Sequence, residues 1–167
     1  LSGDAETEIC NLKEIFDETI KTLEYKIEEK RAIITCNDLP EIKIVVSQFR
    51  RLFQNLISNS LKFSREGIQP EIQVNCKYLS NAEVKQFHLA KAKRYLQIDF
   101  SDNGIGFNNE YKNRIFTIFQ KLHGRSEYEA TGIGLAICKK IAENHGGVIF
   151  ADGKPGEGAI FTVIIPV

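Results

Sequence analysis

Residues 47–63 carry the pattern that most restricts the fold, because a single helix there has two faces of opposite character. Apolar residues recur mostly at steps of three and four, as an amphipathic α-helix requires. They are Phe49, Leu52, Phe53, Leu56, Ile57, Leu61 and Phe63. Polar residues fall at steps of four, four and three on the opposite face: Arg51, Asn55, Asn59 and Lys62. One side of this helix must therefore pack on a core, while the other faces solvent or a ligand.

The polar face has two interpretations. It can be a solvated helix surface, which is the common case. Asparagine, however, is not a preferred residue inside a helix, and an amide oxygen suits Mg²⁺, which is typically shared between protein and substrate phosphates. Lys62 can neutralise a phosphate as a point charge. Asn55, Asn59 and Lys62 are therefore candidates for a metal and phosphate site.

A carboxylate followed by a glycine turn stands directly after the strand predicted at 95–101: Asp102-Asn103-Gly104-Ile105-Gly106. These residue types are also common in ordinary turns. A carboxylate at the end of a buried strand has a fixed position and only accepts hydrogen bonds. It suits the amino group of adenine, where guanine has a carbonyl. We expect the two glycines to let the backbone approach a flat ring.

A second glycine pair, in Thr131-Gly132-Ile133-Gly134-Leu135, is predicted to open a helix over 132–145. The free amides and the dipole of a helix N-terminus form an anion site, although a glycine-rich loop without ligand gives the same pattern. The preceding segment, 120–131, contains Lys121, His123 and Arg125. It is interpreted either as a solvated charged loop or as a lid that closes over a nucleotide.

The remaining patterns predict a helix over 9–31, a turn at 38–40, a short helix over 109–119 and a hairpin turn at 153–156. Strands are expected at 32–36, 71–78, 95–101, 148–151 and 159–165. Residues 80–93 are interpreted as a surface excursion that can contain one helix, with Ser80 as its candidate cap. This order predicts an α+β fold, a two-layer α/β sandwich. No Gly-x-Gly-x-x-Gly opens a βαβ unit, which argues against a dinucleotide fold.

Composition limits the class of partner. The 167 residues suit one domain, and 22 basic and 22 acidic residues give zero net charge. There is thus no general argument for binding nucleic acid or an anionic membrane, and any phosphate site must be built locally. Four scattered cysteines favour reduced thiols in the cytoplasm. Because the chain lacks methionine even at position 1, we expect a fragment; a membrane anchor would then belong to the rest of the parent protein.

Taken in order, these motifs resemble the ATP-binding catalytic domain of sensor histidine kinases, in the superfamily that includes DNA gyrase, mismatch-repair ATPases and a large heat-shock chaperone. Four motifs of that family have counterparts here. Residues 54–63 resemble its asparagine box, 102–107 its first glycine box, 115–119 its phenylalanine box and 131–137 its second glycine box. The closing hairpin at 156–161 also matches. The resemblance covers residues 9–167 and implies that residues 1–8 are the stump of an upstream dimerisation helix domain.

The resemblance implies a mixed, mostly antiparallel sheet covered on one face by three helices, with an ATP lid loop. It implies ATP and Mg²⁺ as cofactors, Asn59 as the metal ligand, and Asn59 and Lys62 as catalytic residues. The implied nucleotide-binding residues are Asn55, Asn59, Lys62, Phe63, Asp102, Gly104, Ile105, Gly106, Ile115, Phe119, Thr131, Gly132, Ile133, Gly134 and Leu135. Phe119 would anchor the lid. Departures from the family pattern are Ser60, Ala130, Ala159 and a long excursion at 77–95; Ser60 is expected to be harmless.

The implied reaction moves the γ-phosphoryl group of ATP to a histidine on a separate domain. None of His88, His123 and His145 is followed by the acidic residue that marks the acceptor. The implied partners are the chain's own dimerisation and phosphoacceptor helix domain and a response-regulator receiver domain, in a homodimeric parent; neither nucleic acid nor a membrane is expected to contact this fragment. Alternatives are a nucleotide-binding regulatory domain without kinase activity, a related ATPase, and a serine kinase that opposes a sigma factor.

Overall fold

The computed structural model describes residues 5–91, 93–117 and 129–167, which form a five-stranded sheet with helices against it. The strand order is β2 (Ile33–Cys36), β4 (Glu71–Tyr78), β5 (Tyr95–Asp102), β7 (Gly158–Pro166) and β6 (Val148–Lys154). Only β2 and β4 pair in parallel in this sheet, and the other neighbours are antiparallel. This confirms the predicted α+β class and the mixed, mostly antiparallel sheet.

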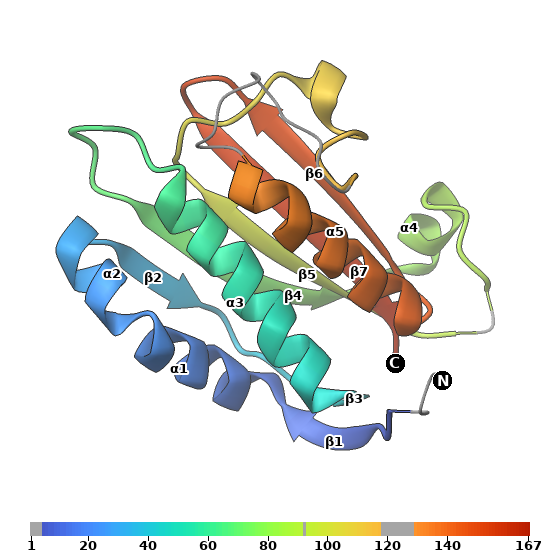
Figure 1. The fold of residues 1–167 in the computed structure, drawn as a ribbon. Coiled ribbons are helices and arrows are strands. Elements are labelled where there is room, and N and C mark those ends of the chain that lie inside the picture. The colour runs from blue at the N-terminus through green and yellow to red at the C-terminus, as the bar shows by residue number, and fades with distance from the viewer. Residues whose placement is uncertain (1–4, 92, 118–128) are drawn as a thin grey trace.

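Helices α1 (Leu12–Thr22), α2 (Glu24–Lys30), α3 (Val46–Lys62) and α5 (Glu129–Asn144) lie together on one face of this sheet (Figure 1). The predicted apolar side of α3 is its buried side, and Phe53 meets Phe100 of β5 edge-to-face with ring centroids 5.1 Å apart. The two-layer arrangement is therefore confirmed. None of the helices among the described residues has the length and apolarity needed to cross a bilayer.

The predicted helix over 9–31 is wrong at its start and in its continuity. Residues Glu8–Asn11 form β1, which pairs antiparallel with β3 (Glu41–Ile44) in a separate two-stranded sheet. Asn11 then caps α1 by accepting a hydrogen bond from the Lys13 N–H at 2.9 Å. The helix is interrupted at Leu23, and α2 follows. The periodicity of 9–31 could not reveal this because the partner of β1 lies thirty residues further along the chain.

The excursion between β4 and β5 contains a short helix, α4 (Asn81–Gln86), which begins with a capping box formed by Ser80 and Glu83. The ring of Phe87 stacks on Phe150 of β6 with centroids 5.7 Å apart. Together with Tyr95 and Ile164 these residues build a second, smaller apolar cluster. The excursion thus covers an apolar part of the sheet that the helical layer does not reach.

Three further boundaries differ from the sequence expectation. The short helix expected over 109–119 is only a 3₁₀ turn, η1 (Asn109–Tyr111), followed by turns, and positions 118–119 lie outside the described residues. Strand β6 runs on to Lys154, because Gly153 and Lys154 pair with β7, so the hairpin turn is shorter than 153–156. Helix α5 begins at Glu129, three residues before the predicted start, so Gly132 and Gly134 lie inside its first two turns.

Helices α3 and α5 run antiparallel and are joined at one end by His145. The Val45 N–H, at the start of α3, donates to Nε2 of His145 at 3.1 Å. Nδ1 of the same ring lies 2.8 Å from the Ile141 carbonyl, and the ring packs edge-to-face on Phe49 with centroids 4.7 Å apart. The other ends of these two helices flank the site described below.

Candidate functional site

The carboxylate of Asp102, the last residue of β5, is held by three donors from three parts of the chain. Its Oδ1 accepts from the Gly104 N–H at 2.9 Å and from the Ala159 N–H at 3.2 Å. Its Oδ2 accepts from the Ser60 hydroxyl at 2.8 Å. Burial raises the pKa of Asp102 above its ordinary value, and these three hydrogen bonds oppose the rise. The result is a carboxylate of fixed orientation that can accept further hydrogen bonds from a ligand.

The glycines after Asp102 allow close backbone packing inside the protein, a role that the sequence analysis did not assign to them. A Cβ on Gly104 would lie 2.5 Å from the Phe63 carbonyl oxygen. Gly106 has φ +63°, and a Cβ there would lie 2.1 Å from the carbonyl oxygen of Lys154. Both glycines are required by close backbone packing inside the protein. The loop is further fixed by the Ile105 N–H, which donates to the Phe63 carbonyl at 2.9 Å.

Asp102 lies in the wall of a narrow apolar slot of about 40 Å³. The slot is lined by Asn59, Phe63, Asp102, Ile105, Gly106, Phe107, Ile115, Leu135, Ala159 and Phe161. Among these, Asp102 is the only ionisable group. Mostly apolar walls with one fixed carboxylate are typical of a site that orients a flat, mostly apolar ligand.

A wider chamber of about 520 Å³ adjoins the slot, since Asn59 and Leu135 line both. It is lined by Lys26, Glu29, Lys30, Asn55, Ser58, Asn59, Leu61, Lys62, Gly134 and Leu135, from α2, α3 and α5. Three lysines face one glutamate there, although the whole chain has no net charge. The cleft therefore changes along its length from apolar to cationic, as an amphipathic anion requires.

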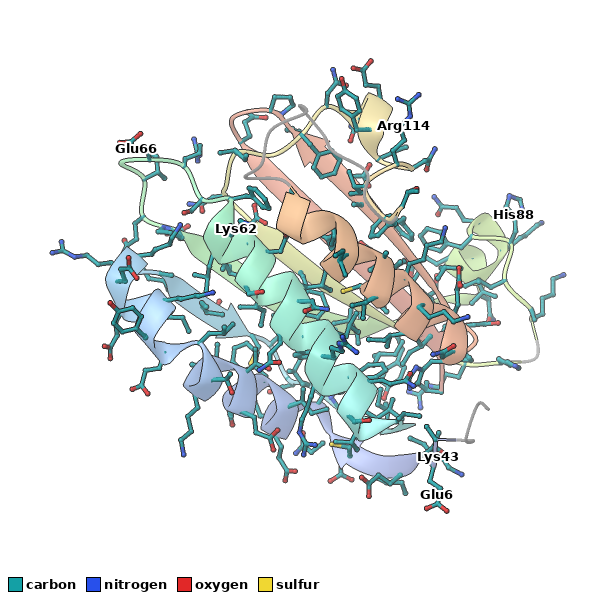
Figure 2. The ribbon with its side chains drawn as sticks, viewed as in Figure 1. Glu6, Lys43, Lys62, Glu66, His88 and Arg114 are labelled. Carbon is teal, nitrogen blue, oxygen red and sulfur yellow. The ribbon has the colours of Figure 1, made fainter. Side chains whose placement is uncertain are left out.

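Two of the chamber lysines are held near the C-terminal end of α3. Lys30 Nζ donates to the Leu61 carbonyl at 2.6 Å and to the Ser64 hydroxyl at 2.9 Å. Lys62 lies over the ring of Phe63, with Nζ 5.6 Å from the centroid, and is labelled at this end of α3 in Figure 2. Neither lysine forms a salt bridge within the described part of the chain. Their charges are available to a ligand.

Asn59 stands at the junction of slot and chamber, and its Oδ1 is buried without a hydrogen-bond partner among the described residues. Burying an amide oxygen without a hydrogen-bond partner costs free energy unless a ligand binds that oxygen. A hard cation that prefers oxygen, such as Mg²⁺, fits this atom. The described residues contain no cluster of three His, Cys, Asp or Glu side chains that could hold a metal by itself. A metal here would depend on Asn59 and on oxygens of the ligand.

Most of the candidate residues from the sequence meet in this cleft. The slot and chamber contain Asn55, Asn59, Lys62, Phe63, Asp102, Ile105, Gly106, Ile115, Gly134 and Leu135. Asn55 also reaches α5, where its Nδ2 donates to the Gly134 carbonyl at 3.4 Å. Gly104 lies beside Asp102 and bonds to it.

The remaining candidates lie elsewhere or are not described. Ile133 is half-exposed and lines a separate hollow with Phe116 and Ile137. Thr131 and Gly132 belong to the first turn of α5. Phe119 and nearly all of the expected lid lie outside the described residues.

Sequence reasoning missed two contributions to the site. Lys26, Glu29 and Lys30 enter the chamber from α2, and no local motif places a helix thirty residues upstream beside α3. Ser60 was expected to be a harmless replacement, yet it is one of the three donors to Asp102. Its position next to Asn59, on the buried side of an amphipathic helix, is a signal that could have found it.

A protein-family model described as histidine kinase-, DNA gyrase B-, and HSP90-like ATPase matches residues 44–167. Among curated relatives, cyanobacterial phytochrome A of Nostoc sp. is 39% identical over 162 residues, which cover 96% of this chain and 19% of the relative. The phytochrome-like protein Cph1 of Synechocystis sp. is 37% identical, with 98% and 20% covered. The adaptive-response sensory kinase SasA of Prochlorococcus marinus is 36% identical, with 78% and 31% covered. The chain thus spans about a fifth of the two phytochromes and about a third of SasA.

Solved structures with the same fold include catalytic domains of histidine kinases. The nucleotide-free catalytic domain of histidine kinase ThkA has a TM-score of 0.75 at 22% identity, with 96% of this chain and 95% of that chain covered. Full-length ShkA in complex with AMPPNP has a TM-score of 0.77 at 20% identity, with 99% and 32% covered. At these identities the likeness establishes the fold.

Proposed function

Because this chain belongs to the histidine kinase-, DNA gyrase B- and HSP90-like ATPase family, we propose that it binds ATP in the cleft described above and is the catalytic domain of a two-component sensor histidine kinase. The observation that carries the proposal is the continuity of the cleft. A fixed carboxylate (Asp102), an amide oxygen without a partner among the described residues (Asn59) and the second turn of α5 (Gly134) line one connected space. These are the groups that a base, a metal and a phosphate chain require in that order.

At the slot end, Asp102 accepts a hydrogen bond from the 6-amino group of adenine. Guanine presents a carbonyl at this position, and two acceptors would repel, so ATP is favoured over GTP. Phe63, Ile105 and Ile115 line the slot and contact the faces of the ring. Their role is to bury apolar surface and to hold the base while the polar end of the nucleotide enters the chamber.

At the chamber end, Asn55, Asn59 and Lys62 face the triphosphate. Asn59 Oδ1 would hold Mg²⁺, which would neutralise charge on the phosphates when bound. Lys62 attracts the phosphates as a point charge. The first turn of α5 presents backbone N–H groups that have no partner inside the helix, which suits an anion.

The reaction follows from this placement. A histidine nitrogen of an acceptor domain attacks the γ-phosphorus, and the bond to the oxygen that bridges the β- and γ-phosphates breaks. A P–N bond forms, the imidazole N–H proton is lost, and ADP leaves. Such transfers depend mainly on positioning and charge neutralisation. We assign these two roles to Asn59 and Lys62.

The acceptor is proposed to be on a separate helix domain of the same parent protein. His145 is engaged between α3 and α5, and Figure 2 shows His88 on the far side of the molecule from Lys62. The further proposed partner is a response-regulator receiver domain. The parent is proposed to be a homodimer whose catalytic domain lies in the cytoplasm, whether or not it is membrane-anchored.

Nucleotide binding is tested by calorimetric titration of the wild type with ATP, in the presence and absence of Mg²⁺, beside Asp102→Asn. The asparagine can keep all three local hydrogen bonds, with its oxygen toward Gly104 and Ala159 and its amide toward Ser60. It then presents a donor to the amino group of adenine. Loss of a hydrogen bond to a charged group costs about 1.5–3 kcal/mol, so we expect ATP affinity about 10- to 150-fold weaker. Asp38→Asn, at an exposed aspartate, is the control.

A wild type that shows no Mg²⁺-dependent ATP binding contradicts the proposal. Kinase activity is tested by mixing the chain with the acceptor helix domain of its parent and γ-labelled ATP. The expected product is acid-labile phosphohistidine on the acceptor. ATP binding without that product would favour a regulatory nucleotide-binding domain.

A further inference from the structure

Ser60 is a polar residue on the buried side of α3. It is only 3% exposed, and its buried neighbours on that side of the helix are apolar, among them Leu56, Ile57 and Leu61. A hydroxyl in such surroundings costs free energy unless it is hydrogen-bonded. Its bond runs to Asp102 Oδ2 at 2.8 Å, across forty-two positions of the chain. The helix that carries Asn59 and the strand that carries Asp102 are therefore joined through this hydroxyl.

The two oxygens of Asp102 are in different situations. Oδ1 already accepts two backbone N–H groups, from Gly104 and Ala159, whereas within the described ranges Oδ2 accepts from Ser60 alone. A carboxylate oxygen can accept about two hydrogen bonds. Oδ2 is therefore the oxygen with capacity left for a ligand, and Ser60 fixes the rotation that decides where this capacity points.

We propose that Ser60 is a positioning residue for base selection: it holds Asp102 Oδ2 toward the amino group of an adenine ring and thereby favours nucleotides that carry this group. The inference rests on the proposed ATP function and deepens it.

The same hydroxyl also acts on the charge of Asp102. Burial raises the pKa of this carboxyl, and the hydrogen bonds from Gly104, Ser60 and Ala159 lower it. Removing the Ser60 hydroxyl therefore raises the pKa further. Another charged group near Asp102 is Arg65, which donates to the Asn103 carbonyl. The hairpin of β6 and β7 adds three more, Asp152, Lys154 and Glu157, in a hollow that Asp102 also lines.

The experiment compares Ser60→Ala with the wild type for two ligands, ATP and the purine-riboside triphosphate that lacks the 6-amino group, at several pH values. ATP affinity is expected to fall about 2- to 13-fold, the range for one hydrogen bond, while the affinity of the amine-free analogue changes less than about 1.5-fold. Because Asp102 must be ionised to accept from the amine, the pH below which ATP affinity declines is expected to move upward. A residue needed only for packing would affect both ligands alike.

The matched control is Thr19→Ala, which removes another buried hydroxyl. Thr19 is also 3% exposed and donates to the Ile15 carbonyl at 2.8 Å on α1, away from the cleft. The Thr19→Ala substitution is expected to lower the stability of the fold without changing the ratio of the affinities for ATP and for the amine-free analogue. If Ser60→Ala does not fold, Ser60→Cys keeps the shape but donates only weakly, and it is expected to weaken ATP binding selectively.

Equal loss for both ligands, or no loss for either, overturns the inference, as does an unshifted pH profile. These results are separate from a failure of the proposed function. If Asp102→Asn weakens ATP binding and Ser60→Ala does not, only the role of Ser60 is refuted. If the wild type binds no ATP, both are refuted.

Discussion

Replacing Asn59 by leucine is predicted to make the ligand-free protein more stable while abolishing its Mg²⁺-dependent affinity for ATP. The Oδ1 of Asn59 is buried and has no partner among the described residues. Leaving such an atom unpaired costs about 1–3 kcal/mol. Leucine has a similar branched shape and a helix propensity better by roughly 0.4 kcal/mol. A gain of about 2 kcal/mol in unfolding free energy would raise Tm by roughly 4–8 °C in a chain of this size.

Thermal and urea unfolding without nucleotide measure the first half of this prediction, and titration with ATP and Mg²⁺ measures the second. Asn55→Leu separates the effect of helix propensity, because the amide of Asn55 already bonds to the Gly134 carbonyl at 3.4 Å. Its Tm is expected to rise less than that of Asn59→Leu. A Tm that does not rise in Asn59→Leu refutes the claim that the oxygen is uncompensated. Retained metal-dependent affinity refutes its role as the metal ligand.

Two further predictions concern the chamber and the glycine turn. Lys26→Ala, which removes one cation from the chamber, should weaken ATP binding about 1.4- to 5-fold, the range for an exposed charge pair, and leave AMP binding unaffected. Glu29→Gln should strengthen ATP binding. If calorimetry finds that Lys26→Ala weakens ATP and AMP binding equally, the placement of the triphosphate in the chamber is contradicted. Gly106→Ala should lower the unfolding free energy by at least about 3 kcal/mol, since a positive φ costs ~1–2 kcal/mol and the new Cβ would also meet the Lys154 carbonyl at 2.1 Å. Gly67→Ala is its control, with φ +75° and open space around the Cβ; equal losses in urea unfolding would show that the carbonyl contact is unimportant.

The helical layer and the main sheet could be predicted from the sequence because their signals are local. The apolar stripe of α3 and the alternation in β4 each depend on a few neighbouring residues, and both were placed within one residue of their ends. β1 and β3 could not be predicted in this way. Each is four residues long, and each exists as a strand only because the other lies beside it.

The same distinction between local signals and long-range packing applies to the site. Asp102, Asn59 and Gly134 stand in recognisable motifs, so their types and spacing indicated a nucleotide site, and the structure brings them to one cleft. The hydrogen bond from Ser60 to Asp102 and the entry of Lys26 into the chamber depend on how α3 packs on β5 and α2. The packing role of Gly106 could not be predicted, because the carbonyl that a Cβ there would meet belongs to Lys154 on β6, far along the chain.

His145 gives the two helices that border the cleft a pivot. It joins the start of α3 to the end of α5 with a 3.1 Å hydrogen bond and a ring contact. Further from His145, the middle of α3 meets the second turn of α5 in the 3.4 Å hydrogen bond between Asn55 and Gly134. The 16 residues of α5 form a lever about 24 Å long. Tilting α5 by a few degrees about this pivot would change the width at the phosphate end by about 2 Å, with little strain at the His145 end.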